Sequence, residues 1–247
     1  AFIMEPVGGA STGALVAPDS YYGRVREICD EFGVLLIYDE VMTGAGRTGK
    51  FLAAEHWGIT PDIVAMSKGF GAGYAPLGAM VAGKRLVDPV LDAGGFLHGF
   101  TYAGNPLACS AGLAVLEEMR EQGLIENAAR MGDILMAKLR DLMDRYPFIG
   151  DVRGKGLLTA FEFVSDRTTM EPLDPKLNAY NLLVELAYER GLIIYSRRTR
   201  GGTAGDHFLI APPLITTEAQ IEEMMAILRD ALDACAKELD LPVEEAA

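Results

Sequence analysis

Acidic side chains and a lysine follow successive apolar runs in the first part of the chain. Glu5 follows the run AFIM, Asp39 and Glu40 follow VLLIY, and Lys68 follows DIVAMS. In open parallel sheets, ligands bind at the carboxyl ends of the strands. If these runs are neighbouring strands, they gather carboxylates and one amine along a single edge, which is a candidate active site.

Lys68 at this edge is suited to Schiff-base chemistry, because a lysine amine can attack a carbonyl group. The run GFGAGYAPLG that follows it is rich in glycine, which lets backbone approach a ligand closely. Taken alone, such a lysine is more often a solvated surface residue. With a carboxylate beside it, the pair meets the needs of pyridoxal phosphate, which takes a lysine at its aldehyde and an acidic residue at its ring nitrogen.

The apolar runs that must position these residues alternate with helical patterns. AFIM, VLLIY, DIVAMS and GAMVA are predicted strands, and a helix is predicted near Tyr21 to Phe32, with Asp19 and Ser20 as candidate N-caps and Gly33 as its stop. This alternation predicts a mostly parallel sheet covered by helices. VLLIY is continuously apolar, which predicts a strand near the sheet's centre, buried on both faces.

Two helices are predicted to follow. Asn105 and Pro106 form an N-cap signal for a helix that runs to about Gly123. Apolar residues from Leu124 to Leu142, at spacings of three and four, predict a second helix that Pro147 ends.

The last part of the chain is predicted to be a smaller α/β domain. LLTAFEFV, LIIYS and FLIAPPL are predicted strands, and a helix is predicted to end near Gly191. Thr217 and Gln220 form a capping box for the last predicted helix. The tail LPVEEAA is predicted to be frayed. We therefore predict three parts: part of a cofactor-binding large domain over 1–104, connecting helices over 105–146, and a small carboxy-terminal domain over 147–247.

The stretch GAGRTGK, residues 44–50, resembles the phosphate-binding loop of nucleotide hydrolases. Such a loop needs Ser or Thr directly after its lysine and a strand running straight into its first glycine. Phe51 follows Lys50, and the residues from Asp39 to Thr43 separate VLLIY from Gly44. Nucleotide hydrolysis is therefore not favoured.

The composition excludes several other classes. The net charge of −13 argues against a nucleic-acid partner, and no apolar run approaches the length of a membrane helix, so we expect a cytoplasmic protein. The three cysteines (Cys29, Cys109, Cys235) and three histidines (His56, His98, His207) are scattered. Buried thiols are the favoured interpretation, and no metal site is predicted.

Six stretches, in order along nearly the whole chain, resemble the class III aminotransferases, the pyridoxal-phosphate enzymes that include ω-amino acid and amine transaminases. They are EPV at 5–7, LLIYDEVMTGAGRTGKF at 35–51, PDIVAMSKGFGAGYAPLGA at 61–79, HGFTYAGNPLA at 98–108, DVRGKGL at 151–157 and GDHFLIAPPLITTEAQI at 205–221. The resemblance implies an α/β protein with the fold type I of PLP-dependent transferases: part of a large domain with a mostly parallel sheet, and a smaller carboxy-terminal α/β domain.

The resemblance also implies roles for individual residues. Lys68 would carry pyridoxal 5'-phosphate as a Schiff base and then act as general base, Asp39 would pair with the pyridine nitrogen, and Val41 would pack against one ring face. Thr101 would reach the cofactor phosphate, usually in the neighbouring subunit, so a homodimer is expected. Glu5 would lie near the ring pocket; the alternative for Glu5 is a purely structural hydrogen-bonding role. The implied reaction moves an amino group from an amino acid or amine to a keto acid, by hypothesis pyruvate.

Members of this family are a good deal longer, and Ala1 corresponds to a position inside a strand of their large domain. We therefore expect a fragment, or one chain of a split enzyme, that needs a separate amino-terminal half for turnover. The alternatives are another PLP reaction on the same fold, an aminomutase or a decarboxylase, and a truncated chain without catalysis.

The substrate-binding arginine is left open by the sequence. Ala10 stands about where some relatives have a glutamate that gates this arginine, and Tyr195 and Ser196 occupy the neighbourhood where amine transaminases carry it. Arg197, Arg198 and Arg200, in the inserted run RRTRGGTAGD, are all candidates for a carboxylate clamp, which arginine forms well. Loop arginines are more often simply solvated.

Overall fold

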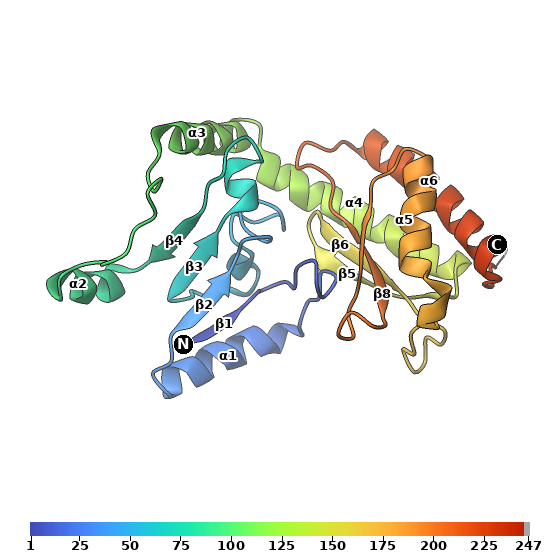
Figure 1. The fold of residues 1–247 in the computed structure, drawn as a ribbon, viewed down its shortest axis with the longest axis horizontal. Helices are drawn as coiled ribbons and strands as arrows, with labels where there is room; N and C mark the ends of the chain where they lie inside the picture. Colours follow the sequence, from blue (N-terminus) through green and yellow to red (C-terminus); the bar gives the residue numbers. More distant parts are fainter. Residues whose placement is uncertain (245–247) are drawn as a thin grey trace. The chain divides into compact units, whose positions relative to one another are not determined.

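The computed structural model describes residues 1–244 as two compact units (Figure 1). The first unit comprises Ala1–Pro6 and Ala17–Ile125, and the second comprises Val7–Val16 and the chain from Glu126 onward. The boundary at Ile125 assigns the first predicted connecting helix to the first unit and most of the second helix to the second unit. The predicted division into three parts remains a prediction. The end of the predicted frayed tail, residues 245–247, lies outside the described residues.

The first unit contains a four-stranded sheet in the order β1-β2-β3-β4. β1, β2 and β3 are parallel and β4 is antiparallel to β3, so the predicted mostly parallel sheet is confirmed. The strands are β1 (Phe2–Met4), β2 (Leu36–Asp39), β3 (Ile63–Met66) and β4 (Ala79–Ala82), and the helices are α1 (Asp19–Glu31), α2 (Lys84–Asp92) and α3 (Pro106–Glu121), with short 3-10 helices η1 (Ala53–Trp57) and η2 (Lys68–Gly71).

β2 lies inside this sheet, as its apolar sequence predicts. Leu36 and Tyr38 are buried and pack with Cys29 of α1, whereas Ile37 on the opposite face is only half-buried. The prediction that β2 is buried on both faces therefore holds only for the face that carries Leu36 and Tyr38. Edge residues are more exposed, with Ile3 of β1 at 62% and Met80 of β4 at 59%.

α1 begins at Asp19, but neither predicted cap forms. Pro18 occupies the N-cap position without a side-chain hydrogen bond, and the Asp19 carboxylate instead accepts a hydrogen bond from the Trp57 indole nitrogen at 2.9 Å. Gly33 ends the helix in the left-handed region at φ +63°, as predicted. At α3 the expected cap is present: Asn105 Oδ1 accepts from the backbone of Leu107 and Ala108.

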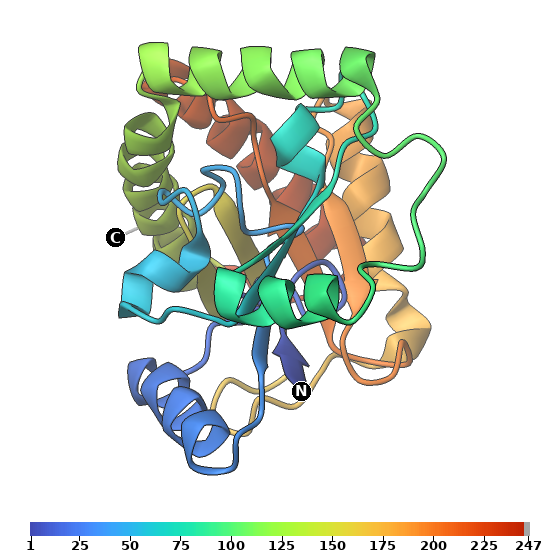
Figure 2. The same cartoon turned by 90° about the vertical axis from the view of Figure 1, so that its left-hand side faces the viewer.

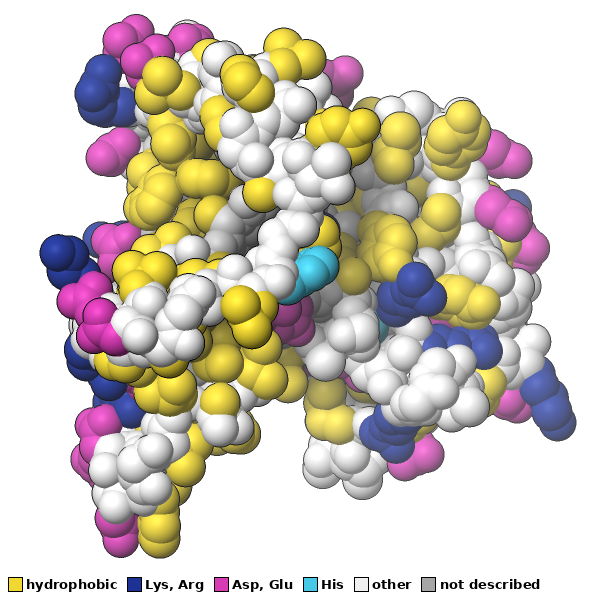
Figure 3. Space-filling view, turned by 60° about the vertical axis from the view of Figure 1, so that its left-hand side comes forward, with side chains coloured by type: hydrophobic (Ala, Val, Ile, Leu, Met, Phe, Trp, Pro, Cys, Tyr) yellow, Lys and Arg dark blue, Asp and Glu magenta, His cyan; other side chains and the backbone are white. Residues whose placement is uncertain are grey.

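Between β4 and α3 the chain makes a long excursion through α2 and a loop (Figure 2). α2 has no buried residue, and the loop carries large exposed apolar side chains, among them Leu97 at 97% exposure. Figure 3 shows hydrophobic side chains gathered on the exposed face of the first unit. Cys109 of α3 is exposed, so the prediction of a buried thiol is wrong there and holds for Cys29 and Cys235.

The second unit contains an antiparallel sheet in the order β5-β6-β8-β7, whose core also includes residues of three helices. The strands are β5 (Ile149–Lys155), β6 (Leu158–Phe163), β7 (Tyr195–Arg198) and β8 (Asp206–Ile210), and the helices are α4 (Leu124–Arg145), η3 (Pro175–Leu177), α5 (Ala179–Glu189) and α6 (Glu218–Leu239). Thr217 and Gln220 form the predicted capping box of α6.

Two strands of this sheet differ from the predictions. β5 was not predicted, because Gly150 and Gly154 interrupt its apolar pattern; a Cβ at Gly150 would lie 2.5 Å from the Val164 side chain. β7 starts at Tyr195 and extends into the inserted run, where Arg198 pairs in register with Asp206. The insertion therefore forms the end of a β-hairpin.

The segment Val7–Val16 is bound to the second unit by two side chains. Arg153 Nε donates to the Gly13 carbonyl at 2.7 Å, and a ring nitrogen of the buried His207 lies 2.9 Å from the Ala10 carbonyl. A Cβ at Gly13, whose φ is +65°, would lie 2.6 Å from the His207 ring. Glycine is therefore required at position 13 for both conformation and space.

Candidate active site

The register of the first sheet brings three of the predicted site residues to one edge. Met4 pairs with Tyr38, and Asp39 pairs with Ala65, so Glu5, Asp39 and Lys68 lie at or just beyond the carboxyl ends of β1, β2 and β3. Neighbouring strands are about 4.8 Å apart, which places the first and third of these chain positions on the order of 10 Å apart. The edge predicted from the sequence is present.

Asp39 ends β2 with its carboxylate held by the next turn. Its Oδ1 accepts a hydrogen bond from the backbone N–H of Val41 at 3.0 Å. Within residues 1–244, no donor is bonded to Oδ2. The side chain is half-buried, so this oxygen is suited to accept a hydrogen bond from a bound ligand.

Lys68 follows β3 in an uncommon backbone conformation. Its φ is +44°, in the left-handed region, where a residue with a side chain stores roughly 1–3 kcal/mol of strain. It opens the 3-10 helix η2, in which Phe70 N–H donates to the Ser67 carbonyl at 2.9 Å. The Lys68 side chain is exposed, and its ammonium forms no ion pair or hydrogen bond with the described part of the chain. Its amine is therefore available for chemistry.

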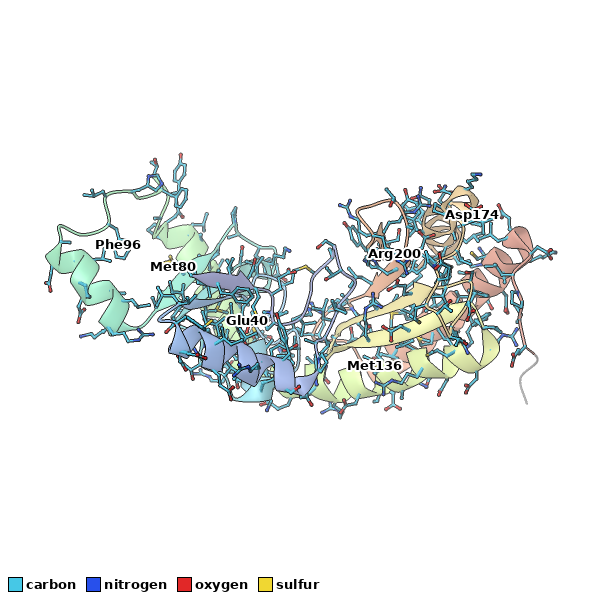
Figure 4. The ribbon with its side chains drawn as sticks, turned by 90° about the horizontal axis from the view of Figure 1, so that it is seen from below. Glu40, Met80, Phe96, Met136, Asp174 and Arg200 are labelled. Atoms are coloured by element: carbon cyan, nitrogen blue, oxygen red, sulfur yellow. The ribbon has the colours of Figure 1, made fainter. Side chains whose placement is uncertain are left out.

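Glu40, next to Asp39, is buried with 1% exposure and lies within the first unit (Figure 4). Its carboxylate accepts hydrogen bonds from Ala53 N–H at 3.0 Å and Ala54 N–H at 2.9 Å, and from the Thr43 hydroxyl. Burial raises the pKa of Glu40, while these donors act in the opposite direction. Glu40 therefore holds the start of η1 against the end of β2.

The GAGRTGK stretch forms a closed turn whose backbone amides are used inside the protein. Gly44 N–H donates to the Glu40 carbonyl at 2.8 Å, and Gly49 N–H donates to the Gly46 carbonyl at 2.9 Å. Arg47 is half-buried, and burial lowers its pKa. A phosphate-binding loop instead points its amides at the ligand, so this geometry also argues against nucleotide hydrolysis.

Val41 and Thr101 have different positions relative to the edge. Val41 directly follows the Asp39–Glu40 pair and is half-buried. Thr101 lies in the exposed loop between α2 and α3, and no hydrogen bond within the described residues joins it to the edge. In this chain, Thr101 is not part of the edge cluster.

The three candidate arginines are in the second unit and differ in their contacts. Arg198 Nε donates to Asp206 at 2.8 Å, and its guanidinium lies 4.3 Å from the centre of the Tyr180 ring. Arg200, labelled in Figure 4, donates to the Met170 carbonyl, and Arg197 donates to the Tyr195 hydroxyl at 2.6 Å. Arg197 and Arg200 are exposed, whereas Arg198 is part of the hairpin's structure.

Comparison with known proteins identifies the family. Residues 1–232 match the family described as aminotransferase class-III. The chain belongs to the class III aminotransferases. It is 40% identical to an uncharacterized aminotransferase of Bacillus subtilis over 96% of this chain and 54% of that protein. It is 39% identical to a taurine–pyruvate aminotransferase of Bilophila wadsworthia, over 92% of this chain and 50% of that protein.

The fold of this class III chain matches solved transaminases. An amine transaminase from an uncultivated Pseudomonas species, solved in its PLP-bound form, has a TM-score of 0.87 and 39% identity over 94% of this chain and 52% of that one. The predicted fold class is confirmed. The chain spans about half the length of the curated relatives it matches.

Pyridoxal 5'-phosphate is the cofactor of this family, and the residues at the edge fit it. The Lys68 amine has no partner among the described residues, and the Asp39 carboxylate has one oxygen open to a ring N–H. In the described residues, no group of three or more His, Cys, Asp or Glu side chains is arranged to hold a metal ion, and no helix has the length and apolarity to cross a membrane.

Sequence reasoning did not find what Glu40 and Gly44 do. Both lie in motifs named in the sequence analysis, where Glu40 is one of a group of carboxylates and Gly44 is part of a stretch that resembles a phosphate-binding loop. Adjacent residues of a strand point to opposite faces, so the doublet Asp39-Glu40 already implies that only one carboxylate faces a given side of the sheet. That signal could have separated the two acids.

Proposed function

We propose that this chain carries the cofactor lysine of an aminotransferase, which transfers an amino group from an amino acid or amine to a keto acid. The observation that carries the proposal is the unpaired Lys68 amine, at the strand edge where Asp39 keeps an open carboxylate oxygen. Membership of the class III family supports it.

In this proposal, Lys68 has two roles. Its amine would hold the cofactor at the aldehyde, and once an amino donor had displaced it, the freed amine would act as general base at the substrate carbon. Its exposed side chain and the glycines that follow it leave room for this displacement. Bound pyridoxal phosphate supplies an electron sink for the charge that develops on that carbon.

Asp39 and Val41 serve the ring in the proposal. The open Asp39 oxygen would accept a hydrogen bond from the protonated ring nitrogen, and the negative charge of the carboxylate would keep that nitrogen protonated. Val41 would pack against one face of the ring. Thr101 binds the cofactor phosphate of a neighbouring subunit in a homodimer, a role that suits its exposed loop.

We also propose that turnover needs the amino-terminal half that the relatives possess. The exposed edge residues Ile3 and Met80 support this, because a sheet with open apolar edges normally has another segment against it. Pyruvate is the proposed acceptor, since the Bilophila relative and a relative from Pseudomonas aeruginosa are named as pyruvate aminotransferases.

The test is an absorbance titration with pyridoxal phosphate, with and without the amino-terminal half of a relative. Wild type is compared with Lys68→Ala and with Lys50→Ala, which removes another exposed lysine of the same unit. A visible band that Lys68→Ala abolishes and Lys50→Ala retains supports the proposal. A band equal in all three proteins, or no band in any condition, overturns it.

A further inference from the structure

We infer that Glu40 and Gly44 are positioning residues that fix the orientation of the Asp39 carboxylate. The inference rests on the proposed function for the role of Asp39, and on the hydrogen bonds around one peptide unit for its mechanism. That unit joins Glu40 to Val41.

The Glu40–Val41 peptide is held from both sides. Its carbonyl accepts a hydrogen bond from Gly44 N–H at 2.8 Å, and its N–H donates to Asp39 Oδ1 at 3.0 Å. Because a peptide bond is planar, the direction of the carbonyl fixes the direction of the N–H. Gly44 therefore controls, through this peptide, the donor that orients Asp39.

Gly44 can make this contact only as glycine. A Cβ at position 44 would lie 2.8 Å from the Glu40 carbonyl oxygen, and 3.3 Å from both Glu40 Cβ and Met66 Cε. The carbonyl oxygen is backbone, so it cannot move away without turning the peptide. Alanine at this position would therefore tilt the Val41 N–H relative to Asp39.

Glu40 fixes the same peptide from its own backbone and side chain. Its N–H donates to the Ala65 carbonyl of β3 at 2.9 Å, which extends the strand pairing one residue past Asp39. Its buried carboxylate is anchored by Ala53 N–H, Ala54 N–H and the Thr43 hydroxyl. These bonds hold residue 40 in place on both sides of its Cα atom. The carboxylate that remains available at the edge is that of Asp39.

The test uses two variant pairs in the full chain, with the amino-terminal half of a relative supplied where wild type needs it. Glu40→Gln keeps the size of the side chain but places an amide where three donors converge. Its control is Glu55→Gln in η1, whose carboxylate accepts a hydrogen bond from Leu52 N–H. Gly44→Ala is paired with Gly23→Ala, a helical position with open space around it.

Two readouts are measured. Amide hydrogen exchange at Val41 without cofactor reports the peptide itself, and the pyridoxal phosphate Kd with the pH dependence of its visible band reports the ring nitrogen held by Asp39. We expect Glu40→Gln and Gly44→Ala to speed exchange at Val41 and to raise the Kd about tenfold, as loss of a hydrogen bond to a charged group does. The pH at which the band changes should shift in these variants and stay constant in the two controls.

Unchanged exchange at Val41 in Glu40→Gln overturns the inference. So does fast exchange combined with a wild-type Kd and an unchanged pH dependence, because a merely structural role would give that result. If Gly44→Ala does not fold, Glu40→Gln decides alone. If wild type has no band that depends on Lys68, the proposed function fails, and exchange at Val41 still judges whether Glu40 and Gly44 hold the turn.

Discussion

Asp39 pairs in register with Ala65, three residues before Lys68 on the neighbouring parallel strand. The parallel pairing brings the carboxylate and the amine to one edge, although 28 residues separate them in the sequence. The distance between them is set by the sheet. Substitutions at either position therefore test the chemistry without disturbing a mutual contact.

Asp39→Asn should abolish most amino transfer while leaving the fold intact. The amide oxygen of asparagine can still accept the Val41 N–H, but a neutral side chain cannot keep a ring nitrogen protonated. We expect kcat/KM to fall by about a hundredfold or more. Steady-state assays of the chain with its amino-terminal half measure this, with Asp88→Asn, an exposed acid of α2, as the control. Retention of full activity would exclude the proposed role of Asp39.

Stability should depend on pH through His207. Burial lowers the pKa of His207 below its ordinary value of 6.5. The hydrogen bond to the Ala10 carbonyl opposes this, the neighbouring Arg153 acts in the same direction as burial, and Glu162 opposes it. His207 therefore binds a proton more readily in the unfolded chain than in the folded chain. As a result, the unfolding free energy falls as pH drops below about 6.5. Urea unfolding at about pH 8 and about pH 5 measures this. His207→Gln should reduce the difference, and an unchanged difference would show that other groups cause it.

Arg198 and Arg197 should differ in their effect on stability. Arg198→Ala leaves the Asp206 carboxylate, itself 4% exposed, without its ion-pair partner, which should cost about 2–4 kcal/mol. Arg197→Ala removes an exposed side chain and should change the unfolding free energy by less than about 0.5 kcal/mol. Denaturant unfolding compares the two, and equal effects would contradict the assignment of Arg198 to the hairpin.

The exposed edges of the first sheet should make the chain prone to self-association. We expect light scattering to grow with concentration for the chain alone and to fall when the amino-terminal half of a relative is added. Met80→Lys should reduce scattering by placing a charge on the edge strand β4. If neither the added half nor Met80→Lys changes the scattering, the surface that causes self-association lies elsewhere, and the apolar loop around Leu97 is the next candidate.

The sequence predicted features that depend on local signals. The caps at Asn105 and Thr217 are set within a few residues, and both are present. Asp19 is not the cap because it is the first residue of α1, after Pro18 at the N-cap position, and its carboxylate accepts a hydrogen bond from Trp57, far along the chain. β5 was not predicted because its glycines interrupt the apolar pattern. They are glycines because a side chain there would collide with Val164 and with the start of β6, which only the folded sheet reveals.

The candidate site follows the same division. Parallel strands predict the edge that holds Asp39 and Lys68, and the motifs supply the identity of the cofactor. The role of Gly44 depends on where the Glu40 carbonyl points after the strand ends. That direction cannot be predicted from the spacing of residues in the sequence. The exposure of Cys109 likewise depends on which face of α3 is covered in this chain.

The assignment of Val7–Val16 to the second unit means that the polypeptide passes between the units three times, after Pro6, after Val16 and after Ile125. A single protease cut near Ile125 would therefore leave residues 7–16 on the amino-terminal piece, held to the carboxy-terminal piece by noncovalent contacts alone. A recombinant piece starting at Glu126 would lack the Gly13 and Ala10 carbonyls that Arg153 and His207 bind. Such a piece would expose two polar side chains evolved for burial, so dissection of this protein should fuse residues 7–16 to the carboxy-terminal segment.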